Sequence, residues 1–180
     1  AVEGTDIVPD FATHAFRFLN GTSNITAEKI ERDLDRPEWG AKPFVPTGFK
    51  GVIEGDIELV GNAVNGSATP LAPVLRIGGM AETLVVGPPA LARYNPISTS
   101  IPSASCYFQH GGTIKRLLGA RAAISAIALE VKKYPMAKVR IEGNATEATE
   151  SAYPGVVDYS AFGDPLAITT ENAVMTINGF

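Results

Sequence analysis

Two histidines and one cysteine are the side chains in this sequence best suited to catalysis or metal binding. Cys106 and His110 stand four positions apart, so on a strand they would share a face, as a nucleophilic thiolate and its base would. His110 falls at the tip of a predicted hairpin and Cys106 alternates with core-type residues, which favours an inert, buried thiol. Neither His14 nor His110 has a second His or Cys at the spacing of zinc ligands. The sequence therefore predicts no catalytic residues, no metal site and no cofactor.

Glu54, Asp56 and Glu58 form the second pattern that could bind a ligand. They alternate with apolar residues at positions 53, 57 and 59, as on a half-buried strand with an acidic exposed face. A calcium site would need a loop with ligands at alternate positions closed by a glutamate, which this segment lacks. We therefore expect these carboxylates to face solvent or the lumen of a channel.

Length and composition predict one β-rich domain. The chain has 180 residues and a mass of 18.9 kDa, enough to bury a sizeable core. Its 18 glycines and 13 prolines favour short strands joined by turns. The net charge of −4 disfavours a grip on nucleic acid, which requires a basic face. The single cysteine rules out an internal disulfide framework, and no apolar run reaches the ~20 residues of a membrane-spanning helix.

Four N-glycosylation motifs would suit a secreted protein. They begin at Asn20, Asn24, Asn65 and Asn144. The same residue types are those that turns and strand ends use, and a secreted domain of this size with one cysteine would be unusual. We favour the interpretation as turns, and keep a secreted β-sandwich binding module as an alternative.

The first part of the chain divides into an arm and the start of the domain. Residues 1–24 show no clear period and predict an extended arm with a few apolar anchors. Residues 25–180 then form a single β-rich domain. Within it, residues 25–36 fit either a helix or a strand, because their apolar residues make only a thin helical stripe. Residues 37–48 predict a loop.

The rest of the domain is predicted to contain one helix and a series of strands. Thr69 as N-cap and Pro70 at the first helical position predict a short helix over about residues 70–78, ended by Gly78-Gly79. The strands and their main connections follow in this order: 49–60, 82–86, 105–109, a tight turn, 113–118, a bend at Gly119-Ala120-Arg121, 122–131, a turn at Tyr134-Pro135, 136–143, a polar loop over 144–171, and 173–177.

An ordered series of motifs resembles a known family. The series is Ala68-Thr69-Pro70 before the helix, Ile77-Gly78-Gly79-Met80-Ala81-Glu82-Thr83 after it, Tyr94-Asn95-Pro96, a hairpin with a small-residue turn, Leu118-Gly119-Ala120-Arg121, an alternating strand, a turn ending in Pro135 and a strand closing at Gly143. It resembles the major tail tube proteins of long, non-contractile-tailed bacteriophages, and the resemblance covers roughly residues 49–145. In the hairpin turn the family often has an acidic residue, where this chain has His110-Gly111-Gly112.

The resemblance implies a β-sandwich or barrel of the tail-tube type with one flanking helix, assembled as stacked hexameric rings. Unpaired strand edges would be satisfied by neighbouring copies around each ring. The family-like structural residues are Gly78, Gly79, Gly119, Ala120, Arg121 and Pro135. The lumen is expected to be acidic, since carboxylates repel the phosphates of passing DNA. The candidate lumen-facing residues are Glu54, Asp56, Glu58, Glu130 and Glu142.

The same resemblance implies partners and a location. The chain would bind copies of itself, and the tube would meet tape measure, tail terminator and distal tail proteins. Genomic DNA would pass through without specific binding, and no membrane would be bound. The protein would be made in the bacterial cytoplasm and reside in the virion tail. The arm and the 144–171 loop would connect rings, so deleting residues 1–18 is expected to leave a folded monomer with impaired tube growth.

The alternatives within the same class are other ring-forming virion components, namely a capsid decoration protein, a tail terminator or the tube of a contractile apparatus. The secreted binding module is the alternative from another class. An enzyme is disfavoured, because no set of nucleophile, base and oxyanion donors can be assembled from the sequence.

Overall fold

Strands dominate the structure, a computed structural model. It describes residues 5–11, 14–32, 44–62, 64–146, 149–150, 157–160 and 162–169. The strands are β1 (Leu19–Glu31), β2 (Phe44–Glu58), β3 (Met80–Val85), β4 (Leu91–Pro96), β5 (Ala104–His110), β6 (Thr113–Ala128), β7 (Met136–Ala145) and β8 (Thr149–Glu150), and the helix is α1 (Ala72–Ile77). The predicted mainly β fold with one short helix is confirmed.

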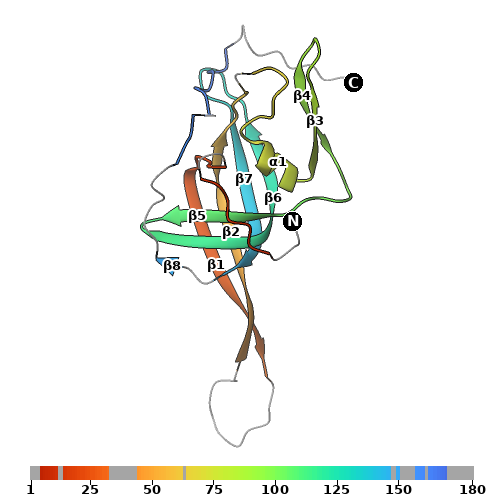
Figure 1. The fold of residues 1–180 in the computed structure, drawn as a ribbon. Coiled ribbons are helices and arrows are strands. Elements are labelled where there is room, and N and C mark those ends of the chain that lie inside the picture. Colours follow the sequence, from red (N-terminus) through yellow and green to blue (C-terminus); the bar gives the residue numbers. More distant parts are fainter. Residues whose placement is uncertain are drawn as a thin grey trace, which may run out of the picture.

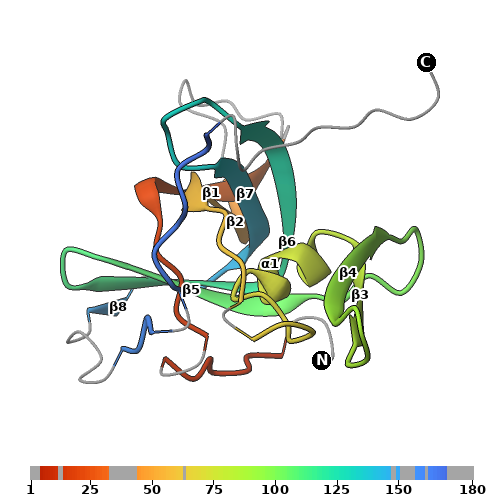
Figure 2. The same ribbon diagram turned by 90° about the horizontal axis from the view of Figure 1, so that it is seen from above.

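Six of the strands form one antiparallel sheet that is curled into a half-barrel (Figures 1 and 2). Its order is β1-β2-β7-β6-β5, and β8 pairs with the beginning of β6. β3 and β4 make a separate two-stranded sheet. Within the described part of the chain, β1 and β5 each pair with a strand on one side only, so the main sheet keeps two open edges.

The core lies on the concave face of the main sheet. Every second residue is buried over residues 51–57 of β2 and 137–141 of β7, and Ile53, Ile57, Val139 and Ile141 are each 2% exposed or less. These side chains pack in one cluster with Leu71 and Val74 from the helical region. Burial of such a side chain stabilises the fold by roughly 1.5–3 kcal/mol, so this alternation fixes which face of the sheet turns inward.

The predicted bend at Gly119-Ala120-Arg121 is a bulge inside a single long strand. The pairing of β6 with β7 shifts register between Leu118 and Arg121, and Gly119 has a φ of 62°, a conformation that favours glycine. Ala120 is fully buried at this point. Strands 113–118 and 122–131 were predicted as separate elements, which is wrong: β6 runs through the bulge because its hydrogen bonds resume on the other side, and it ends at Ala128.

The helix begins later than predicted. α1 starts at Ala72 with Leu71 at the N-cap position, so Thr69 is not the N-cap and Pro70 is not the first helical residue. The Thr69 hydroxyl accepts from the N–H of Leu71 at 3.4 Å and donates to the carbonyl oxygen of Val60 at 2.9 Å, which ties the loop to the end of β2. At the other end, Gly79 has a φ of 83° and provides the predicted left-handed exit.

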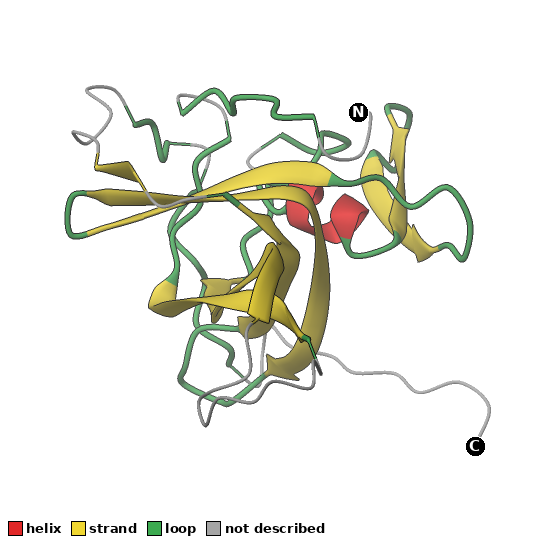
Figure 3. Cartoon of the chain, turned by 90° about the horizontal axis from the view of Figure 1, so that it is seen from below, coloured by secondary structure: helices red, strands yellow, loops and turns green. Residues whose placement is uncertain are grey.

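The small β3–β4 sheet stands beside α1 at one flank of the main sheet (Figure 3). Tyr94 on β4 connects it to the loop before the helix. Its hydroxyl donates to Glu82 Oε2 at 2.8 Å and accepts from the backbone N–H of Thr69 at 3.2 Å. A two-stranded hairpin is marginal by itself, so these contacts help hold the sheet against the body.

The start of the domain differs from the predicted division. β1 already begins at Leu19, so residues 19–24 belong to a paired strand and not to an extended arm. The undecided segment 25–36 is strand up to Glu31, and residues 33–36 lie outside the described part. The predicted loop 37–48 contains the first residues of β2, from Phe44. The predicted strand 173–177 lies outside the described residues.

Candidate assembly surface

The convex face of the main sheet carries a ladder of charged residues. Glu54 on β2 stands opposite Arg140 on β7, and their side chains form an ion pair with 2.7 Å between Nη1 and Oε1. The Nε of Arg140 donates to Glu142, whose hydrogen bond raises the pKa of Arg140. Glu142 in turn stands opposite Arg121 on β6. A second ion pair, between Lys50 and Glu28 at 2.8 Å, continues the charged face onto β1.

The five candidate lumen residues therefore separate into two groups. Glu54, Asp56, Glu58 and Glu142 lie on the β2–β7 part of the sheet, with Asp56 opposite Lys138. Glu58 also lines a groove at the end of β2. Glu130 lies in the turn after β6, where its carboxylate accepts from Lys133 Nζ at 2.5 Å, so the structure does not bring it to the others. Because most of these acids face basic partners, the surface has mixed charge.

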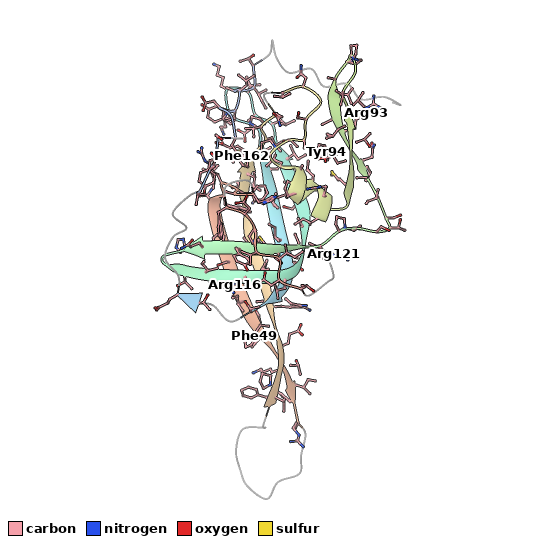
Figure 4. The ribbon with its side chains drawn as sticks, in the orientation of Figure 1. Phe49, Arg93, Tyr94, Arg116, Arg121 and Phe162 are labelled. Atoms are coloured by element: carbon pink, nitrogen blue, oxygen red, sulfur yellow. The ribbon has the colours of Figure 1, made fainter. Side chains whose placement is uncertain are left out.

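Exposed apolar side chains gather at two opposite ends of the molecule (Figures 1 and 4). At one end, the hairpin of β1 and β2 projects from the body and carries Ile30, Phe44, Val45 and Phe49, each 48–60% exposed. The other end has two groups: Leu84, Val85 and Val86 at the end of β3, and Ile127, Leu129, Val131 and Tyr134 around the β6–β7 turn. Clustered exposed apolar residues are typical of surfaces that bind another protein.

Neither of these apolar ends was predicted from the sequence. The hairpin lay in a segment whose structure was undecided and in a predicted loop, so its apolar residues could not be assigned to a surface. A usable signal existed at the other end: positions 127, 129 and 131 alternate with smaller or charged residues in an apolar run. The run was predicted only as part of an alternating strand, but β6 leaves the core after Ile124, and its last four residues are exposed.

The family-like structural residues occupy turns and close contacts. Gly79 accepts through its carbonyl oxygen from the N–H of Ile97 at 2.8 Å, which joins the helix exit to the end of β4. Pro135 accepts from the N–H of Leu59 at 2.9 Å and extends the β2–β7 pairing by one step. Gly119 and Ala120 form the β6 bulge, and Arg121 lies on the charged face. These residues shape the sheet and its surface.

Cys106 and His110 do not form a thiolate and base. Phe108 stands between them on the strand, and its ring lies 6.4 Å from that of His110 in a stacked arrangement. Cys106 packs against the core cluster, and desolvation raises the pKa of its thiol from 9.0 to about 11. The thiol is therefore protonated at neutral pH and is a poor nucleophile.

This raised pKa predicts a loss of stability at alkaline pH. Above pH 9 the thiol ionises in the unfolded chain, while in the folded chain it keeps its proton until about 11. Ionisation in this window favours the unfolded state, so the wild type should lose about 2 kcal/mol relative to Cys106→Ala between about pH 8 and about pH 11. Urea unfolding of both proteins across that range measures the difference. A constant difference would show that the thiol is not desolvated.

Three comparisons, with protein-family models, curated proteins and solved structures, gave no match to the chain. Within the described residues, no helix is long and apolar enough to span a membrane. No group of three or more His, Cys, Asp or Glu side chains placed to hold a metal ion occurs in the same part of the chain.

Proposed function

We propose that the chain is a structural subunit of a bacteriophage tail tube, of the long, non-contractile type, which self-assembles into stacked hexameric rings. The proposal rests on the motif series between residues 49 and 145 and on the surface of the molecule. Its partners would be copies of itself, the tape measure, terminator and distal proteins of the tail, and DNA in transit. The virion tail would be its location.

The observation that carries the proposal is the position of the exposed apolar residues at opposite ends of the molecule. A contact between one end of a subunit and the opposite end of the next is heterologous, and repetition of such a contact builds a filament. The projecting β1–β2 hairpin supplies one apolar end, with Phe44 and Phe49, and the β6–β7 turn supplies the other, with Leu129 and Tyr134. Burial of these groups between subunits would favour assembly.

The open edges of the main sheet support lateral association in the same way. β1 and β5 each have one side without a paired strand in the described structure, and such edges are readily paired with another chain. A closed ring would remove every open edge of this sheet. The concave side of each half-barrel is filled by its own core, so the convex faces of the subunits would line the lumen of such a ring.

The charged face is the candidate wall of that lumen. Arg140 neutralises part of the charge of Glu54 and Glu142, so the wall would be weakly acidic with alternating signs rather than uniformly negative. Such a wall still offers no continuous basic track to which phosphates could bind. DNA would therefore slide along it without specific contact.

Negative-stain electron microscopy of concentrated protein tests the proposal directly. We expect long hollow filaments of constant diameter. Rings that never stack would favour another ring-forming virion component, such as a capsid decoration or terminator protein. Particles that remain single chains at every concentration would contradict the proposal.

A further inference from the structure

The segment at the start of the described chain, residues 5–11, lies on β5 and is named here the docked segment. Two side chains of the strand make polar contacts with it, and at its end the carbonyl oxygen of Phe11 accepts from the N–H of Asp158 at 3.4 Å. Ser105 Oγ accepts from the N–H of Ile7 at 2.9 Å and donates to the carbonyl oxygen of Thr5 at 3.5 Å. Tyr107 donates its hydroxyl hydrogen to Asp6 Oδ2 at 2.7 Å. The contacts made by Ser105 and Tyr107 are exposed to solvent, so each contributes little to holding the docked segment in place.

The surface of β5 that contacts the docked segment is held in place by the pairing of β5 with β6. Tyr107 stands opposite Arg116 of β6, whose guanidinium lies over its ring at 5.2 Å from the centroid. The ring of Phe11 contacts the same tyrosine, with 6.3 Å between centroids. Because pairing with β6 holds Tyr107 and both neighbours of Ser105 in position, the surface would keep its shape when the docked segment leaves.

The docked segment fits this surface only in part. The groove of about 1050 Å³ that Glu58 lines at the end of β2 extends from core residues such as Ile53 to residues 103–110 of β5 and the loop before it. Ile7 and Val8 also line it, yet they stay 53% and 67% exposed. The single chain thus leaves the groove unfilled and two apolar side chains of the docked segment incompletely covered.

We propose that the docked segment of one copy seats on β5 of a second copy when the protein assembles. The occupant is identified by the contacts already present: the backbone at Thr5 and Ile7 matches Ser105, and the Asp6 carboxylate matches the Tyr107 hydroxyl. An identical chain offers the same groups, so every one of these contacts is kept on exchange, as in domain swapping. It also places a second body against Ile7 and Val8. This inference rests on the proposed self-assembly and names the surface through which copies are linked.

Engineered cysteines distinguish exchanged from unexchanged segments. In a Cys106→Ala background, Ile7→Cys is made in one protein and Ser105→Cys in another, at positions whose backbone and side-chain atoms are in hydrogen-bond contact. The two proteins are mixed, assembled and oxidised. A disulfide between them forms above the level of random collision only if the docked segment of one chain lies on β5 of the other. We expect a covalent heterodimer on non-reducing gels, about tenfold above the control, because seated cysteines have a millimolar effective concentration.

The control replaces Ile7→Cys by Ser98→Cys, at an exposed position in the loop after β4 and outside the two apolar ends, and measures random collision with Ser105→Cys. A chain with both Ile7→Cys and Ser105→Cys should close an internal disulfide before assembly, which checks the geometry. Filaments that give no more heterodimer than the control would overturn the exchange and leave the tube proposal intact. A wild-type protein that forms no filaments would overturn the tube proposal, and the exchange with it.

Discussion

Leu117→Ala should lower the free energy of unfolding by about 2–5 kcal/mol, the range for truncation of a buried leucine. Leu117 is 1% exposed and lies in β6 just before the bulge, within the core cluster. The strands around it are fixed by pairing on both sides of β6, so they can collapse only partly into the space left by the side chain. Urea unfolding at neutral pH measures the loss. Leu129→Ala, at a residue 61% exposed, is the matched control and should change stability by about 0.5 kcal/mol.

Gly51 provides a second test of the same contact. A Cβ added at this glycine would lie 2.1 Å from Leu117 Cδ2, so Gly51→Ala should by itself cost about 1–3 kcal/mol through overpacking. In a Leu117→Ala background the new methyl group finds free space, and the combined loss should be smaller than the sum by about 0.5–3 kcal/mol. Strict additivity of the two substitutions would show that the side chain of Leu117 does not cover Gly51.

Local alternation explains which elements could be predicted. In the paired parts of β2 and β7 one face is buried and the other is charged. Apolar and charged residues therefore alternate along the sequence, as Ile53, Glu54 and Ile57 illustrate. β1 lacks this period, because the positions on its inner face include Gly21 and Ser23. Their neighbours come from distant parts of the chain: the Phe108 ring lies over Gly21, and Lys115 Nζ donates to Ser23 Oγ at 2.8 Å. Such tertiary contacts leave no pattern within the strand itself.

The charged face of the main sheet could likewise be predicted only in part. Alternation placed Glu54, Asp56 and Glu58 on one face, and Glu142 on another strand of the same kind. Their basic partners depend on strand register, which a single strand does not reveal: Arg140 meets Glu54 only because β7 pairs with β2 in one alignment. Glu130 was grouped with them because strand 122–131 was extended too far, whereas β6 ends before it.

Removal of residues 1–10 is expected to abolish filament growth while leaving the domain folded. This truncation removes Asp6, Ile7 and Val8, which make the proposed link to β5 of a second copy and pack little in the single chain. Unfolding in urea should show nearly unchanged stability, because the hydrogen bonds that the truncation removes are exposed to solvent. Light scattering at rising protein concentration measures assembly, and electron microscopy identifies its product.

The extent of the deletion decides what this experiment means. The sequence-based choice of residues 1–18 also removes Phe16 and Phe18, which pack against the core cluster. A Cβ on Gly55 would lie 2.4 Å from Phe18 Cδ1, so this ring packs directly on β2. Its removal would open a cavity and lower the free energy of unfolding by about 3–5 kcal/mol. We therefore expect the longer deletion to unfold more easily, and its failure to assemble would carry no information about the docked segment. The shorter deletion separates the two effects: a stable chain that still polymerises at the wild-type concentration would exclude any role of residues 1–10 in linking copies.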